Sequence, residues 1–485
     1  MNNREIMAKG VIWASVSQLV TQALHFISLI ILARLLSPTE FGLMGMAILL
    51  ISLITTINNL GLGAAIIQKK DLDHGQLSSV FWLNFVFGFF LAGVVIVLRP
   101  LIVAFFRYPE LYPMLGVISF SFILNFGIVQ NSLLQKNLEF KKLAFAEIGA
   151  ELLYGITAVV LALLGKGVWA LVFGLLVRTA ALSLLLWMVG GWFPLFYFSF
   201  SKIRKLFGFS FNVLGNSLVN FFSNNIDYIL IGRFLSAEPL GFYTLAFQLM
   251  VFPQQKISSI ITRVTFPLFS RLQNENERLK KGYLKTISFV ALIIFPALFG
   301  LFAVSSNFIM VVYGERWLLA IVPLQIMCFA GMIKSLTPVL GNVLLAKGRS
   351  DINFKWNSAR VVLTVIAVYY GVRFGINGVA VAVTAVTFLT QPFLQKIANK
   401  SIGLHFKEYM RSLSGPFFAS VIMSFLVYFL NNFLLISINP VINLSISILF
   451  GIGIYYVLLL LFRVDEFFEL LFLLKSLIKN KLKER

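Results

Sequence analysis

Fourteen stretches of mostly apolar residues, separated by short breaks that carry Lys, Arg, Pro or Gly, run through the whole chain. They fall near 10–33, 42–66, 78–98, 111–134, 143–164, 167–189, 208–231, 241–269, 284–304, 319–345, 358–372, 377–395, 414–434 and 441–462. A helix that crosses a membrane needs about 20 predominantly apolar residues. The pattern therefore predicts an all-α polytopic membrane protein with about fourteen transmembrane helices.

The composition excludes a soluble globular protein. Hydrophobic residues make up 59% of the 485 residues and charged residues only 12%. An ordinary soluble domain has roughly 45–50% apolar and about 25% charged residues. The single cysteine, Cys328, lies inside an apolar stretch and is expected to be a small buried side chain.

The positions of the cations predict the orientation, because alternate breaks between spanning helices face opposite sides of a membrane. Of the 40 Lys and Arg residues, 29 fall in the two termini and the even-numbered breaks, 7 in the odd-numbered breaks and 4 within spans. Cytoplasmic loops carry the excess of Lys and Arg, so both termini are predicted to be cytoplasmic. The net charge of +21 is then mostly a consequence of topology and indicates no nucleic-acid partner.

An internal repeat divides the chain. The segment 33–42, which contains Arg34, Pro38 and Gly42, resembles 232–241, which contains Arg233, Pro239 and Gly241, at an offset of 199. We therefore predict two six-helix lobes, 1–200 and 201–405, followed by a helix pair at 406–462 and a basic cytoplasmic tail at 463–485. Six spans per copy give both lobes the same orientation, related by an axis along the membrane normal. Arg34, Arg233, Pro38 and Pro239 then occupy equivalent outer turns, either as hinges or as simple helix ends.

Polar residues follow one face of the first helix of each predicted lobe. Asn212, Asn216, Asn220, Asn224 and Asp227 are spaced 4, 4, 4 and 3 residues apart, and Ser17, Thr21, His25 and Ser28 precede the last four of them by 199. Gln18 and Gln22 widen the stripe on the first helix. Lipid cannot hydrogen-bond such a face, so the two stripes are expected to line a substrate cavity. The alternative is that they join neighbouring helices by hydrogen bonds.

Charged groups inside the spans are few, and each is a functional-site hypothesis because a charge in hydrocarbon is costly. The cations are Arg178, Lys256, Arg263 and Lys334, and the acids are Glu147, Glu151 and Asp227. Either these groups pair with one another or the cations hold an anionic ligand in the cavity. Asp227, Glu147, Glu151 and His25 are also the titratable groups available for ion coupling, although His25 is equally interpretable as structural.

The sequence lacks the motifs expected of ATP hydrolysis, metal binding and a soluble catalytic domain. No G-x-x-x-x-G-K-[ST] sequence occurs, no His, Cys and acid cluster has metal-ligand spacing, and no break exceeds about 20 residues. These absences predict a secondary transporter with no cofactor and no metal, rather than an enzyme.

The segment 33–42, the Asn-rich stretch with 225–232, and the twelve-plus-two spans resemble the Wzx-type polysaccharide transporters of the multidrug/oligosaccharidyl-lipid/polysaccharide exporter superfamily, in the colanic acid and teichuronic acid exporter branch. The resemblance implies a flippase that moves an undecaprenyl-pyrophosphate-linked oligosaccharide to the outer leaflet of a bacterial inner membrane by alternating access. It also implies coupling to H⁺ or Na⁺, and polysaccharide polymerase and chain-length machinery as partners. A peptidoglycan lipid-precursor flippase and a multidrug/cation antiporter of the same superfamily are the alternatives.

Overall fold

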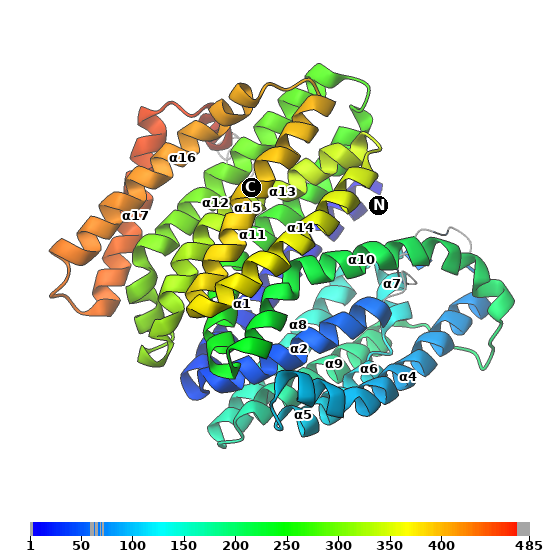
Figure 1. The fold of residues 1–485 in the computed structure, drawn as a ribbon. Helices are drawn as coiled ribbons and strands as arrows, with labels where there is room; N and C mark the ends of the chain where they lie inside the picture. The colour runs from blue at the N-terminus through cyan, green and yellow to red at the C-terminus, as the bar shows by residue number, and fades with distance from the viewer. Residues whose placement is uncertain (1–2, 59–62, 64–65, 68, 70–71, 473–485) are drawn as a thin grey trace, which may run out of the picture. The chain divides into compact units, whose positions relative to one another are not determined.

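The computed structural model describes residues 3–58, 63, 66, 67, 69 and 72–472 (Figure 1). Within these residues the secondary structure is helical and no strand occurs. The all-α class predicted from the apolar stretches is therefore confirmed.

The chain divides into two compact units, Met1–Gly241 and Phe242–Arg485. The helices that begin in the first unit are α1 (Asn3–Leu35), α2 (Pro38–Asn58), α4 (His74–Phe106), α5 (Leu111–Ile118), α6 (Phe120–Leu124), α7 (Ile128–Lys136), α8 (Phe140–Leu163), α9 (Val168–Gly190), α10 (Phe200–Phe234) and the first turn of α11 (Ala237–Arg271). Helix α10 thus belongs to the first compact unit, whereas the sequence repeat predicts a boundary near 200. The division into 1–200, 201–405, 406–462 and 463–485 remains a prediction.

The second unit contains most of α11 and the remaining helices. These are α12 (Asn276–Val312), α13 (Ile321–Ala346), α14 (Ser350–Gly371), α15 (Gly375–Ser401), α16 (Phe406–Phe429) and α17 (Pro440–Leu461), with short η1 (Glu315–Ala320), η2 (Val372–Phe374) and η3 (Leu430–Leu434). Helix α12 packs against α13, α16 and α17, and α15 packs against α13 and α14. The fully buried side chains of Trp317 and Tyr283 lie in this unit.

Ten helical segments in the described part are long and apolar enough to cross a membrane, or eleven if the bent pair Leu111–Leu124 and Ile128–Lys136 counts as one span. Helices α14 and α15 count together as Phe354–Ser401. Helices α10 and α11 coincide with expected spans but are not among the ten, and α10 is the helix with the Asn-rich stripe. The chain is therefore a multi-pass membrane protein, and fourteen crossings remain a prediction.

One expected span is a broken helix. Helices α6 and α7 flank a break at 125–127, and the two parts of this span differ in direction by 45°. Carbonyl groups freed at such a break must find donors inside the protein. Asn84 Nδ2 of α4 donates to the Asn125 carbonyl at 3.3 Å, and Trp187 Nε1 of α9 donates to the Phe126 carbonyl at 3.4 Å. Side chains of two neighbouring helices thus satisfy the broken backbone.

The two repeat-related turns pack against each other within the first unit. A Cβ atom on Gly42 would overlap the carbonyl oxygen of Ala237, and one on Gly241 would overlap the carbonyl oxygen of Pro38. Since Ala237 and Gly241 correspond to Pro38 and Gly42 at the offset of 199, the contact is reciprocal. Two elements related by a two-fold axis make this kind of self-complementary contact. The absence of a side chain at both glycines lets the first turns of α2 and α11 touch backbone to backbone.

We expect Gly42→Ala and Gly241→Ala each to destabilise the protein, because the added methyl group overlaps a backbone oxygen that has no flexible side chain to move aside. Overpacking of this kind costs about 1–3 kcal/mol. Thermal unfolding in detergent, followed by size-exclusion chromatography, measures the effect. Gly93→Ala is the matched control, since nothing lies within 4 Å of a Cβ at that helical position. Equal melting temperatures for all three variants would contradict the close approach.

Candidate functional site

A buried carboxylate joins three helices of the first unit. Glu151 on α8 is 3% exposed, and its Oε2 accepts a hydrogen bond from Arg178 Nε of α9 at 2.6 Å. Its Oε1 lies 2.9 Å from His25 Nδ1 of α1. Because the carboxylate only accepts, the neutral His25 donates from Nδ1 in this arrangement. The structure therefore brings together three residues that the sequence had assigned to two different roles.

Small residues allow these helices to come close. A Cβ on Gly155 of α8 would lie 2.5 Å from Ser28 Oγ of α1, and one on Gly174 of α9 would lie 3.0 Å from Ala158 Cβ of α8. Small residues at helix interfaces are typical of membrane proteins, where close backbone packing replaces hydrophobic driving force. Glu151 also borders a groove of about 240 Å³ together with Leu24.

The arrangement places a basic ring beside an ion pair. Arg178 and Glu151 cancel each other's charge, so the cluster is neutral when His25 is neutral and carries one positive charge when His25 is protonated. The side chains of His25 and Arg178 are each 46% exposed in the described structure, whereas Glu151 is buried. The His25 ring also stacks on Tyr154, with ring centroids 6.0 Å apart.

A second acid lies one helical turn before Glu151. Glu147 Oε2 accepts a hydrogen bond from Ser17 Oγ of α1 at 2.6 Å. Thr21 donates to the carbonyl oxygens of its own helix, while Gln18 and Gln22 are half-buried. Part of the polar stripe on α1 thus joins α1 to α8, as the hydrogen-bonding alternative expects, and the two glutamines remain available to a ligand.

The stripe on α10 has two kinds of residue. Asn220 and Asn224 are exposed, and the Asn224 amide donates to the Asn220 carbonyl at 2.9 Å within the helix. Asp227 is 4% exposed, and its Oδ1 accepts from the backbone N–H of Tyr228 at 3.0 Å. Asn220 and Asn224 are therefore the exposed amides among the described side chains of the stripe.

The other intramembrane cations are only partly described. Lys334 of α13 is half-buried, and its Nζ lies 5.9 Å from the centre of the Phe247 ring, a cation–π contact within the second unit. The side chains of Lys256, Arg263 and Asn216 lie outside the described residues. The sequence-based assignment of these three to a cavity stays a prediction.

The residues of the outer turns help to hold the reciprocal contact. Arg233 Nη1 donates to the Phe105 carbonyl at 2.6 Å, and Tyr108 Oη accepts from the Ala237 N–H at 2.8 Å. Pro38 is buried and begins α2, while Pro239 lies half-buried in the first turn of α11, and Arg34 is exposed. Both prolines stand in first turns, where a missing N–H removes no helical hydrogen bond.

Sequence reasoning missed two residues near these sites. Arg360 was not included among the four cations predicted within spans, but it is half-buried within the candidate span Phe354–Ser401. Its place inside the short apolar stretch 358–372 was the available signal. Tyr154 was missed because an aromatic residue in an apolar stretch is indistinguishable from ordinary packing. No group of three or more His, Cys, Asp or Glu able to hold a metal occurs among the residues searched, which are those described.

The fold is similar to that of solved membrane-protein structures. The structure superposes on the lipid II flippase MurJ in its inward closed conformation with a TM-score of 0.77 at 15% identity, covering 94% of this chain and 99% of that one. It also superposes on an inward-facing multidrug resistance MATE family transporter of the MOP superfamily, with a TM-score of 0.59 at 18% identity over 80% of this chain and 98% of that one. At these identities the likeness shows the fold.

Sequence comparison identifies the family. A family model described as "Polysaccharide biosynthesis protein" matches residues 31–322. The chain is 31% identical to the lipopolysaccharide biosynthesis protein WzxC of Escherichia coli (strain K12), over 87% of both chains. It is 32% identical to the teichuronic acid biosynthesis protein TuaB of Bacillus subtilis (strain 168), over 88% of this chain and 89% of that one. The chain belongs to the Wzx-type polysaccharide transporters of the MOP superfamily, as the resemblance of its motifs predicted.

We expect Arg178→Gln to destabilise the protein more than Glu151→Gln, because it leaves the buried Glu151 carboxylate without its cation, whereas the half-exposed Arg178 can be solvated. Leaving a buried charge without its partner costs up to about 3–5 kcal/mol. The double variant should lose less than the sum of the two single losses, which a double-mutant cycle on thermal stability measures. Glu139 and Lys142 at the start of α8 form an exposed ion pair at 2.5 Å and serve as the matched control, with an expected coupling of about 0–1 kcal/mol. Additive losses at 151 and 178 would show that the pair carries no coupling.

Proposed function

We propose that this protein moves an undecaprenyl-pyrophosphate-linked oligosaccharide from the cytoplasmic to the outer leaflet of a bacterial inner membrane. The observation that carries the proposal is the match along nearly the whole chain to proteins named for polysaccharide biosynthesis. A further such relative is the succinoglycan biosynthesis transport protein ExoT of Rhizobium meliloti (strain 1021), which is 29% identical over 95% of this chain and 94% of that one. In this proposal the chain is a transporter and not an enzyme.

The substrate explains why polar groups are kept inside the spans. A sugar chain and a diphosphate cannot cross hydrocarbon unaided, because each polar group would lose its hydrogen bonds to water. The accessible amides of Gln18, Gln22, Asn220 and Asn224 can replace those bonds for the sugar. The cations Lys256, Arg263 and Lys334, and the exposed part of Arg178, supply positive charge for the diphosphate. The polyprenyl tail has no polar atoms to satisfy and stays in lipid.

The repeat supports alternating access between two lobes of the same orientation. The reciprocal contact of Gly42 with Ala237 and of Gly241 with Pro38 lies at turns that the cation distribution places on the outer side of the membrane. Such a contact closes the outer ends of the first helices of each copy. In alternating access, this contact opens on the outer side while the inner side closes. The cavity is then exposed to each side in turn, and the helices themselves keep their structure. Both termini face the cytoplasm in this topology.

The cluster of His25, Glu151 and Arg178 is the proposed site of ion coupling, with H⁺ as the ion. Protonation of His25 changes the cluster from neutral to positive beside a buried carboxylate, and a half-exposed imidazole can exchange its proton. Asp227 and Glu147 are each held by hydrogen bonds and are the alternative carriers. Polysaccharide polymerase and chain-length machinery are the partners that would receive the flipped unit.

Deletion of the gene tests the function directly. Surface polysaccharide should stop while lipid-linked repeat units accumulate on the cytoplasmic leaflet, since synthesis continues and translocation does not. Accumulation is measured by extracting the lipid-linked units, and their sidedness by the access of an impermeant glycosidase to sealed vesicles. Normal polysaccharide output in a strain without a second transporter would overturn the proposal. Accumulation of peptidoglycan precursor instead would favour the lipid-precursor flippase, and drug sensitivity alone the multidrug antiporter.

The accessible amides of α10 give a prediction for the cavity. Asn220→Leu together with Asn224→Leu should reduce flipping by about tenfold or more, because each removes a hydrogen-bonding group that contributes about 0.5–1.5 kcal/mol. The Asn224 amide bonds within its own helix, so thermal stability is measured alongside flipping to separate a folding defect from a transport defect. Flipping is measured in proteoliposomes with a fluorescent lipid-linked glycan. Asn432→Leu is the control, because Asn432 is partly exposed and its amide likewise bonds to a backbone carbonyl four residues earlier, that of Tyr428. Unchanged flipping by the double variant would remove this stripe from the cavity.

A further inference from the structure

The second unit contains a pocket that the transport cycle described above does not use. It encloses about 480 Å³, within the range of roughly 300–1,000 Å³ typical of ligand sites, and lies between α12, α13, α15 and α16. Its walls are mainly apolar, with Phe295, Phe299, Phe329, Phe388, Phe417 and Phe418 among the lining residues. Several of these rings are partly exposed, so the pocket opens toward the surface that faces lipid.

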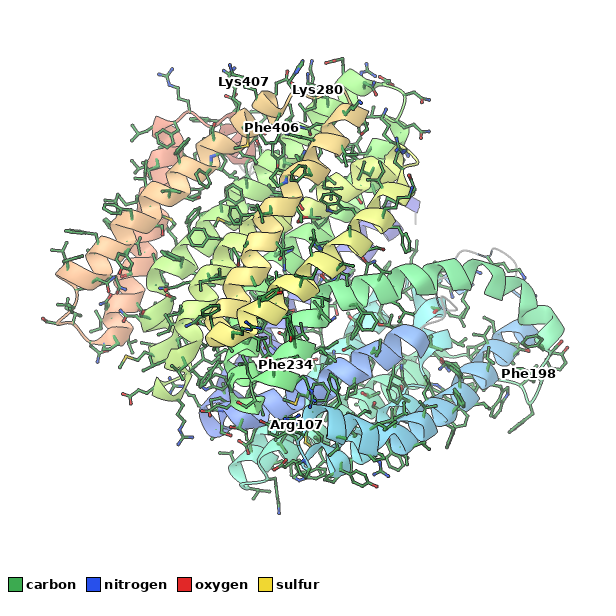
Figure 2. All side chains as sticks on the ribbon, viewed as in Figure 1. Arg107, Phe198, Phe234, Lys280, Phe406 and Lys407 are labelled. Carbon is green, nitrogen blue, oxygen red and sulfur yellow. The ribbon has the colours of Figure 1, made fainter. Side chains whose placement is uncertain are left out.

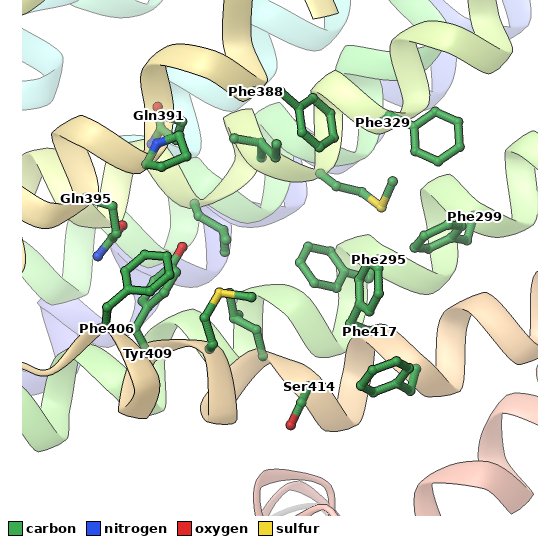
Figure 3. Close-up of a pocket in the computed structure, with 17 residues that line it drawn as sticks. Phe295, Phe299, Phe329, Phe388, Gln391, Gln395, Phe406, Tyr409, Ser414 and Phe417 are labelled. Atoms are coloured by element: carbon green, nitrogen blue, oxygen red, sulfur yellow. The ribbon is translucent and has the colours of Figure 1, made fainter. Parts of the chain in front are cut away.

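The two ends of the pocket differ in chemistry. Figure 3 shows Gln391 and Gln395 on the same side as Phe406 and Tyr409, with Phe295, Phe299 and Phe329 on the opposite side. Gln395 is fully engaged, because its amide bonds to Tyr283 Oη at 2.8 Å and to Asn399 Oδ1 at 2.7 Å. The pocket therefore has one polar and one aromatic end.

Gln391 is the amide at this end that has no protein partner. The residue is 8% exposed, and among the described residues it forms no hydrogen bond. Its polar atoms are not fully buried, so they can bond to a ligand or to water in the pocket. Its position in the lining of an otherwise apolar pocket indicates a ligand with a hydrogen-bonding atom at that depth.

Two cations lie beside the pocket on α16, outside its lining. On α16 the residues Lys407, Arg411, Ser414 and Phe418 are spaced 4, 3 and 4 apart and so form one stripe, of which Ser414 and Phe418 line the pocket. Lys407 and Arg411 are exposed, and neither forms an ion pair with a described residue. Figure 2 shows Lys407 near Phe406 and Lys280 at one end of this unit.

The neighbouring acid does not cancel this charge. Glu408 is bonded to Lys280 Nζ of α12 at 2.9 Å and accepts from the His405 N–H at 3.2 Å. The Glu408 carboxylate is thus paired with a cation of α12 and caps the first turn of α16. The cations of the stripe remain available to an anion from outside the protein.

We propose that this pocket binds an anionic glycerophospholipid of the cytoplasmic leaflet. One acyl chain lies among the phenylalanines, the ester or glycerol oxygens bond to Gln391, and the phosphate lies between Lys407 and Arg411. A polyprenyl phosphate offers the same apolar tail and anionic head, but it has no polar atom below the phosphate that could reach Gln391. The unpartnered amide therefore favours the glycerophospholipid.

Lipid binding to the purified full-length protein tests the proposal. Native mass spectrometry of protein released from nanodiscs compares phosphatidylglycerol with phosphatidylcholine of the same acyl chains, and with polyprenyl phosphate as a competitor. We expect phosphatidylglycerol to bind at least tenfold more tightly than phosphatidylcholine, and Lys407→Gln with Arg411→Gln to remove most of that preference. Gln391→Leu should weaken binding of both phospholipids. Lys355→Gln, an exposed cation on α14 outside the pocket lining, is the control.

Two results would overturn the proposal. One is equal binding of phosphatidylglycerol by the wild-type protein and by the double variant. The other is displacement of the phospholipid by polyprenyl phosphate that depends on Gln391 and on the two cations, which would assign the pocket to the transported lipid. Both results concern binding in the purified protein, so a failure here is distinct from a failure of the flippase function, which the deletion tests.

Discussion

Hydrocarbon offers no hydrogen-bonding partner, and this constraint determines where every polar group of the protein can lie. Within the described residues the polar groups inside spans follow three solutions. Some bond to their own helix, as Thr21 and Asn224 do. Some join helices, as Glu151 joins α1, α8 and α9. Others, such as Gln391, line a pocket and form no hydrogen bond with a described residue.

The same constraint explains why the fold was predictable from the sequence. Apolar stretches of membrane-spanning length leave the helix as the simplest structure that satisfies its own backbone, and each predicted stretch coincides with a helix or a bent helix. The break at 125–127 was not predicted, because its backbone is satisfied by Asn84 and Trp187 from other helices. Such partners are distant in sequence and leave no local pattern.

The candidate site was predictable as a set of residues but not as a set of pairs. The sequence separated Arg178, as a ligand for a diphosphate, from His25 and Glu151, as ion carriers. The structure places all three in one cluster, because α1, α8 and α9 pack together through small residues such as Gly155 and Gly174. Helical periodicity reports which residues share a face of one helix, and it does not report which faces meet. Arg360 was missed for a related reason, since its depth depends on where α14 begins.

The reciprocal glycine contact has a consequence for how the sequence can change over time. Position 42 is constrained by the backbone at 237, and position 241 by the backbone at 38, so each copy of the repeat supplies the surface that limits the other. Neither copy is free to diverge at these turns as an independent domain would. A substitution that adds a side chain at 42 or at 241 has to be accommodated by the backbone of the other turn, although the two turns lie 199 positions apart in the chain.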